Sequence, residues 1–165
     1  MSNSICNKIM NKILISHRGN IFGSKPEQEN KPEYILKAIS NGFDVEIDIW
    51  NSKDKLFLGH DNPETNINKD FLLQNRQYLW CHAKNLTALE KLLDMGMTCF
   101  WHQEDYYTLT SNNYIWTYPD QSVGSNSIWV MPEMAGINET QTDLYLSNCI
   151  GICSDFIGEY IWTKQ

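Results

Sequence analysis

Pairs of titratable side chains separated by one residue recur along this chain, each at the end of a short apolar run. The pairs are Glu46 and Asp48, His82 and Lys84, His102 and Glu104, and Cys153 and Asp155. In an extended strand, residues i and i+2 project to the same face, so we predict that both members of each pair share a face. Two carboxylates placed in this way are hard oxygen ligands, which makes Glu46 and Asp48 candidate ligands for Mg²⁺ or Ca²⁺.

A second group of residues has the chemistry of phosphate binding and proton transfer. His17 and Arg18 are adjacent at the end of the run KILISHRG, and His60 follows the run LFLG. The planar guanidinium group of arginine can bind two phosphoryl oxygens at once, and histidine can donate or accept a proton near neutral pH. Beside a metal-bound phosphate, one imidazole can deprotonate the attacking hydroxyl or water while the other protonates the leaving alkoxide.

The elements that must position these side chains are short and alternate along the chain. Apolar runs rich in Ile, Val, Trp and Tyr predict seven strands, and residues 53–61 resemble a further extended piece. The predicted strands lie within residues 12–19, 43–50, 78–85, 98–105, 114–120, 127–133 and 149–156. Apolar residues at helical spacing predict helices over 31–42 and 85–96. This alternation is typical of parallel strands with crossover helices, in a barrel or an open doubly wound sheet.

The position of the polar residues in these runs favours a site at one end of the sheet. In a parallel barrel, active sites are built from the carboxyl ends of the strands. Burying unpaired charges there costs several kcal/mol per ion, so a metal or an anionic substrate is the expected compensation. A structural salt-bridge network, or strands in another register, is the alternative. His102 and Glu104 fit rim residues and a surface turn equally well, and Trp116 fits either a substrate contact or the core.

Bulk composition excludes several classes of function. A length of 165 residues predicts one domain, and 13 basic against 20 acidic residues give a net charge of -7. This charge repels phosphate backbones, so we expect no nucleic-acid partner, although one arginine and one metal can still bind a small anionic ester. The five cysteines include no CxxC pair and are interpreted as buried free thiols. Without a signal-like segment or an apolar stretch of about 20 residues, we expect a cytoplasmic protein with no membrane span.

Taken in order, these motifs resemble the glycerophosphodiester phosphodiesterase family, within the phospholipase-C-like phosphodiesterases. Over roughly the first 65 positions the likeness consists of HRG (17–19), a loop with Pro26, Glu29 and Asn30, a helix ending at Gly42, ExD (46–48), the KDK hairpin (53–55) and HD (60–61). HAK (82–84) resembles the family's third-strand ExK, and GICSDF (151–156) its last-strand GIxTDxP. The resemblance implies an α/β barrel of the triosephosphate-isomerase (TIM) type, here abbreviated, with several outer helices shortened or missing.

The resemblance also implies a role for each matching residue. His17 and His60 match the two catalytic histidines of the family, and Arg18 matches the arginine that binds the phosphate. Glu46 and Asp48 match the carboxylates that bind the metal. Lys84 matches a lysine that can steady a phosphoryl oxygen, and His102 and Trp116 are added as candidate substrate contacts. His82 stands where the family has a third carboxylate, which tilts the metal preference from Ca²⁺ toward softer ions. We expect one divalent metal, Mg²⁺ first, with Ca²⁺ and Mn²⁺ left open.

Three functions follow from these observations and stay open at this point. The first is metal-dependent hydrolysis of a small glycerol-, sugar- or headgroup-type phosphodiester by a pair of histidines. The second is a non-catalytic module that binds a phosphorylated ligand, and the third is a sphingomyelinase D-like lyase that forms a cyclic phosphate. Because a complete barrel of this type has about 250 residues, the barrel can be incomplete or partnered in a homo-oligomer.

Overall fold

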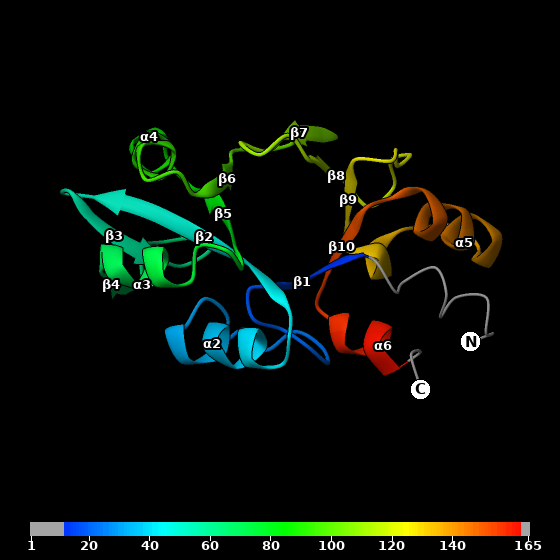
Figure 1. Cartoon of the computed structure of the whole chain (residues 1–165), viewed down its shortest axis with the longest axis horizontal. Coiled ribbons are helices and arrows are strands. Elements are labelled where there is room, and N and C mark those ends of the chain that lie inside the picture. Colours follow the sequence, from blue (N-terminus) through cyan, green and yellow to red (C-terminus); the bar gives the residue numbers. More distant parts are fainter. Residues whose placement is uncertain (1–11, 163–165) are drawn as a thin grey trace.

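The computed structural model describes residues 12–162, which form a mixed α/β fold around one curled, ten-stranded sheet. Neighbouring strands along the main path of the sheet are parallel. In spatial order they are β6 (Thr98–Phe100), β5 (Leu79–Ala83), β2 (Asp44–Ser52), β1 (Ile13–His17), β10 (Gly151–Ser154), β9 (Ser127–Val130) and β8 (Ile115–Thr117). The path curves into a half-barrel (Figure 1). Six of the seven predicted strand segments contain one of these strands, and β2 runs two residues beyond the segment predicted at 43–50.

Three further strands extend the sheet in the antiparallel sense. They are β3 (Lys55–Leu58) and β4 (Thr65–Ile67), which continue from the long β2 as a meander, and β7 (Tyr107–Leu109), which pairs with β8. The extended piece expected at 53–61 is therefore β3 with its two flanking turns. Sequence patterns did not predict β4 and β7, because neither is a buried apolar run: Ile67 is the one buried residue of β4, and β7 has none.

Helices cover the outside of the curve at some crossovers and are missing at others (Figure 1). They are α2 (Pro32–Ser40), α3 (Lys69–Gln74), α4 (Leu86–Asp94), α5 (Glu139–Asn148), α6 (Ile157–Trp162) and the 3₁₀ turn η1 (Pro132–Met134). The predicted helices at 31–42 and 85–96 are confirmed as α2 and α4. Between β6 and β9 the described chain contains no helix, as the short connections predicted. No helix within residues 12–162 has the length and apolar character needed to cross a membrane.

The two faces of the sheet bury separate apolar clusters. The larger cluster lies between the sheet and the helices and contains Ile47, Ile49 and Trp129. The smaller one lies inside the curve and consists of Ile15, Trp80, Phe100, Trp116, Ile128 and Cys153. Four cysteines are buried free thiols, as predicted, namely Cys81, Cys99, Cys149 and Cys153. Cys6 lies outside the described residues.

A serine side chain completes the hydrogen bonding of β6, where the sheet lacks a neighbouring strand. The Ser111 backbone N–H donates to the Cys99 carbonyl at 2.8 Å, and the Cys99 N–H donates to Ser111 Oγ at 2.9 Å. Ser111 Oγ also donates to the Met97 carbonyl at 3.0 Å. An unpaired strand edge is a liability, and this loop residue covers it with both its backbone and its side chain.

Close packing inside the sheet makes one glycine position sensitive to a single added carbon. A Cβ on Gly151 in β10 would lie 2.6 Å from Ile128 Cδ1 and 2.9 Å from the Ile13 carbonyl oxygen. We expect Gly151→Ala to lower the free energy of unfolding by about 1–3 kcal/mol in a urea titration, because the neighbouring strands must shift. The matched control is Gly124→Ala, where the nearest atom is 4.0 Å away. An equal stability of the two variants would contradict this packing.

Candidate active site

A layer of polar side chains lies directly above the inner apolar cluster, at the carboxyl ends of the parallel strands. Because side chains alternate along a strand, the residue two positions beyond each inner core residue also faces inward. In this way His17 follows Ile15 on β1, and His82 follows Trp80 on β5. His102 and Asp155 lie just beyond the ends of β6 and β10, two residues after Phe100 and Cys153. The strand register then places Asp48 beside His82 and Glu46 beside His17. The sheet therefore gathers the predicted site residues at one end.

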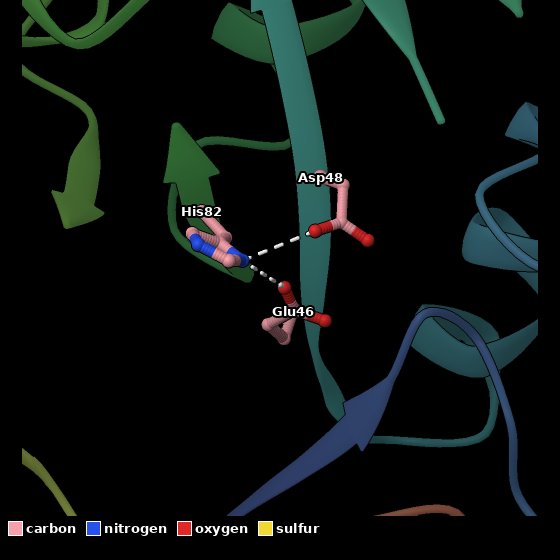
Figure 2. Close-up of side chains that lie close together, drawn as sticks. All are labelled: Glu46, Asp48 and His82. Carbon is pink, nitrogen blue, oxygen red and sulfur yellow. Dashed lines mark ion pairs between the residues drawn. The ribbon is translucent and has the colours of Figure 1, made fainter. Parts of the chain in front are cut away.

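The candidate metal ligands Glu46, Asp48 and His82 come together in this layer. Figure 2 shows the two carboxylates on β2 and the imidazole on β5 pointing toward one another. His82 Nδ1 lies 3.1 Å from Asp48 Oδ1 and 3.9 Å from Glu46 Oε1. All three residues are buried, and one potential ligand atom from each lies within 4.8 Å of the other two. The two carboxylate oxygens suit Mg²⁺, Ca²⁺ or Mn²⁺, whereas the imidazole nitrogen suits softer divalent ions such as Zn²⁺.

Asp48 is enclosed by donors from three separate parts of the chain. Asn30 Nδ2 donates to Asp48 Oδ2 at 2.8 Å, and the Asp48 N–H donates to Asn30 Oδ1 at 2.9 Å. Arg18 Nε lies 3.0 Å from Oδ2, and Lys84 Nζ lies 3.4 Å from Oδ1. Burial alone would raise the pKa of Asp48, but the His82 hydrogen bond and the Arg18 charge outweigh burial and lower that pKa. Asp48 is therefore a buried carboxylate whose ionised form is stabilised by Arg18, Asn30, His82 and Lys84.

Glu46 has fewer partners, and this imbalance fits a bound cation. Within residues 12–162 its Oε2 atom is buried without a hydrogen bond, as is Asp48 Oδ1, and His17 Nε2 lies 3.9 Å from Glu46 Oε2. Burial and the neighbouring negative charge of Asp48 raise the pKa of Glu46. A cation held between Glu46, Asp48 and His82 would satisfy this carboxylate and lower its pKa. The residues present thus fit a divalent metal.

His17 is oriented by a carboxylate from the last strand. Its Nδ1 atom lies 2.7 Å from Asp155 Oδ1, so the opposite nitrogen, Nε2, is directed toward Glu46. Asp155 is itself held, because Asn20 Nδ2 donates to Oδ1 at 2.8 Å and the Asp155 N–H donates to Glu133 Oε1 at 2.8 Å. Burial would lower the pKa of His17, but the Asp155 hydrogen bond and the Glu46 charge outweigh it and raise that pKa.

His60 approaches the site from the turn between β3 and β4. Gly59 precedes it with a φ of 145°, and a Cβ there would lie 2.1 Å from the Asn62 carbonyl oxygen, so the turn requires glycine. His60 Nδ1 lies 2.7 Å from Asp61 Oδ1, and 44% of the side chain is exposed. Partial burial and the positive charge of Arg18 lower the pKa of His60. The lowered pKa favours the neutral form of His60, which lies outside the metal triad.

One cavity of about 550 Å³ joins these groups. The predicted site residues that line it are His17, Arg18, Glu46, His60, His82, Lys84, His102 and Trp116, while Asp48 lies beneath them. The His102 ring stacks on His82 with centroids 4.6 Å apart, and burial lowers the pKa of His102 to about 4. The prediction that Glu104 shares its face on a strand is wrong, because β6 ends at Phe100 and both residues follow in a loop.

No protein-family model, curated protein or solved structure matches the chain. The assignment of a function therefore depends on the residues themselves.

Two contributors to the site were missed in the sequence. Trp50 lines the cavity two residues beyond Asp48, so strand alternation carried a signal that identifies it. Asn20 lies in a loop, is fully buried and connects Asp155 to Glu29 by two hydrogen bonds of 2.8 Å. No periodic pattern marks a loop residue of this kind.

The metal triad predicts a selective loss of cation binding. We expect the protein to bind one Mn²⁺, and Glu46→Gln to weaken that binding about tenfold or more, because a ligand charge is removed. Electron paramagnetic resonance of free Mn²⁺ during a titration measures the affinity. Glu64→Gln is the matched control, since Glu64 is an exposed carboxylate of the neighbouring turn and lies outside the triad. Equal Mn²⁺ affinity for Glu46→Gln and the unmodified protein would refute the site.

Proposed function

We propose that this protein is a metal-dependent phosphodiesterase that hydrolyses a small phosphodiester at the mouth of an abbreviated TIM-type barrel. The observation that carries the proposal is the meeting of three kinds of group in one cavity. A buried carboxylate pair with His82 offers a cation site, Arg18 and Lys84 offer positive charge, and His17 and His60 offer two imidazoles. The resemblance to the glycerophosphodiester phosphodiesterase motifs supports the same chemistry.

Binding of the phosphate group is assigned to Arg18 and Lys84. Both are in ion-pair contact with Asp48 and both line the cavity, so their positions are set before a substrate arrives. Positioned cations stabilise the negative charge that develops on phosphoryl oxygens during phosphate transfer. When bound, the metal would add Lewis-acid polarisation of a phosphoryl oxygen. Glu46, Asp48 and His82 would hold it, and we expect Mg²⁺ first, with Mn²⁺ and Ca²⁺ as alternatives to compare.

Proton transfer is divided between the two histidines. His60 is half-exposed and directs Nδ1 to Asp61, which leaves Nε2 free to accept the proton of an attacking water. His17 lies against Asp155 and Glu46, which stabilise its protonated form, so it can give a proton to the leaving alkoxide. The water oxygen forms the new bond to phosphorus as the bond to the leaving oxygen breaks. The products are a phosphate monoester and an alcohol.

Loss of either histidine is expected to reduce turnover strongly. We expect His17→Ala and His60→Ala each to lower kcat/KM about 10²–10⁴-fold, the usual contribution of a general acid or base. Hydrolysis of bis(p-nitrophenyl) phosphate and of glycerophosphodiesters, with Mg²⁺, Mn²⁺ or Ca²⁺, provides the assay. Lys55→Gln, an exposed change on β3 away from the cavity, should leave the rate unchanged.

Two outcomes of this assay would overturn the proposal in different ways. Equal rates for His17→Ala and the unmodified protein would remove the catalytic pair. Tight binding of a phosphorylated ligand without turnover, unaffected by a chelator, would instead identify a binding module. Phosphorus NMR of the products separates hydrolysis from the lyase reaction, because a lyase forms a cyclic phosphate.

A further inference from the structure

Two cavities lie on either side of the proposed catalytic residues. The first, of about 550 Å³, is called the aromatic cavity here, and the second, of about 500 Å³, the polar cavity. They share His17, Arg18, His60, Asp61 and Met131 in their walls. A phosphorus atom held by Arg18 between the two histidines would therefore have one cavity on each side. The two alcohols of a phosphodiester would then enter different cavities.

The remaining walls of the two cavities differ in chemistry. The aromatic cavity is lined by the side chains of Trp50, Trp101, Trp116 and Tyr118, and also by Val130 and Met134. The polar cavity has no aromatic side chain apart from the shared histidine rings, and it is lined by Ser24, Glu29, Asn30, Glu64 and Asp155. One side of the site therefore favours a flat apolar group, and the other favours hydrogen-bond donors such as hydroxyl groups.

The aromatic walls are fixed by contacts that do not involve a ligand. Trp116 packs on Phe100 with ring centroids 4.5 Å apart and on Trp80 at 6.1 Å, and only 6% of its surface is exposed. Trp50 Nε1 donates a hydrogen bond of 2.7 Å to the Gly59 carbonyl, which ties that ring to the turn carrying His60. A wall held in this way loses little conformational entropy when a ring packs against it.

We propose that the substrate is an asymmetric phosphodiester whose alcohol in the aromatic cavity carries a planar aromatic ring. This inference rests on the proposed phosphodiesterase function. The aromatic cavity is lined by the cations Arg18 and Lys84 and also by the carboxylates of Glu46, Asp61 and Asp105. Its charges are therefore mixed, and the preference for a planar ring comes from its aromatic walls. In the polar cavity, the carboxylates of Asp61 and Glu64 accept hydrogen bonds from hydroxyl groups and repel a second anion.

The test compares two diesters that differ only in the ring. Glyceryl 2-phenylethyl phosphate and glyceryl ethyl phosphate both release a primary alcohol. We expect kcat/KM to be about tenfold or more higher for the phenylethyl diester, in line with the discrimination that an apolar pocket achieves. Equal kcat/KM for the two diesters would overturn the inference while leaving the phosphodiesterase function in place.

A matched pair of tyrosine variants tests whether the preference for the phenylethyl diester arises in the aromatic cavity. Tyr118 lines the aromatic cavity and Tyr107 lines neither cavity, yet 47% of each residue is exposed. Tyr118→Ser should reduce the preference for the phenylethyl diester several-fold, whereas Tyr107→Ser should leave it unchanged. Because both residues are on the surface, neither change removes core packing. A preference that survives Tyr118→Ser unaltered would contradict the placement of the ring.

A binding measurement separates this inference from the catalytic proposal. Tryptophan fluorescence titrations with 2-phenylethyl phosphate and ethyl phosphate report on the aromatic cavity whether or not turnover occurs. Tighter binding of the phenylethyl compound without hydrolysis of either diester would support the aromatic cavity and refute the phosphodiesterase function. Adenosine 5′-phosphate, used as a third ligand, distinguishes a nucleoside from a simple aryl alcohol. Tighter binding of choline phosphate than of 2-phenylethyl phosphate would overturn the aromatic assignment.

Discussion

The fully buried carboxylate of Asp48 is the constraint on which the rest of the site depends. A buried charge costs several kcal/mol unless donors surround it. Four side chains converge on this group. They are Arg18, which follows β1, Asn30 from the next loop, His82 from β5, and Lys84, which follows β5. Arg18 and Asn30 both adopt positive φ angles, of 53° and 56°, in reaching these positions. Such strained conformations persist where the surroundings over-determine them, and they concentrate at functional sites. The same contacts that neutralise Asp48 also hold two cations at the cavity wall.

Strand β2 links the position of Asp48 to the packing of the fold, because its two faces contact different parts of the molecule. Val45, Ile47 and Ile49 point into the outer core, while Glu46 and Asp48 point into the curve of the sheet. A shift of register by one residue would exchange the two sets, burying carboxylates among helices and exposing apolar side chains to the cavity. The apolar packing of β2 against α2 and α4 therefore fixes the position of the candidate metal site.

Sequence analysis predicted the parts of the site that follow from local periodicity. Alternation along a strand was sufficient for Glu46, Asp48 and His82, because β2 and β5 are long enough to keep that alternation through the site. It failed at Glu104, since β6 ends four residues earlier. Asn20 acts through contacts with residues distant in sequence, which no local pattern encodes. Ser111 also contacts the edge of β6 from a separate loop, and each cavity is lined by residues from distant parts of the chain. Local patterns could therefore predict neither feature.

The connections between β6 and β9 shape the wall of the aromatic cavity. Between β6 and β9 the described chain uses loops and the short strands β7 and β8 in place of outer helices. Without larger insertions over the mouth, the wall of the aromatic cavity is formed by strand-end side chains and their adjoining loops. Trp116 illustrates the result, because it belongs to the inner apolar cluster and also lines the cavity. Its packing on Phe100 continues through His82 to His102 as a series of neighbouring rings. Specificity and stability are therefore coupled here, since the side chains that would contact an alcohol are also those that fill the centre of the half-barrel.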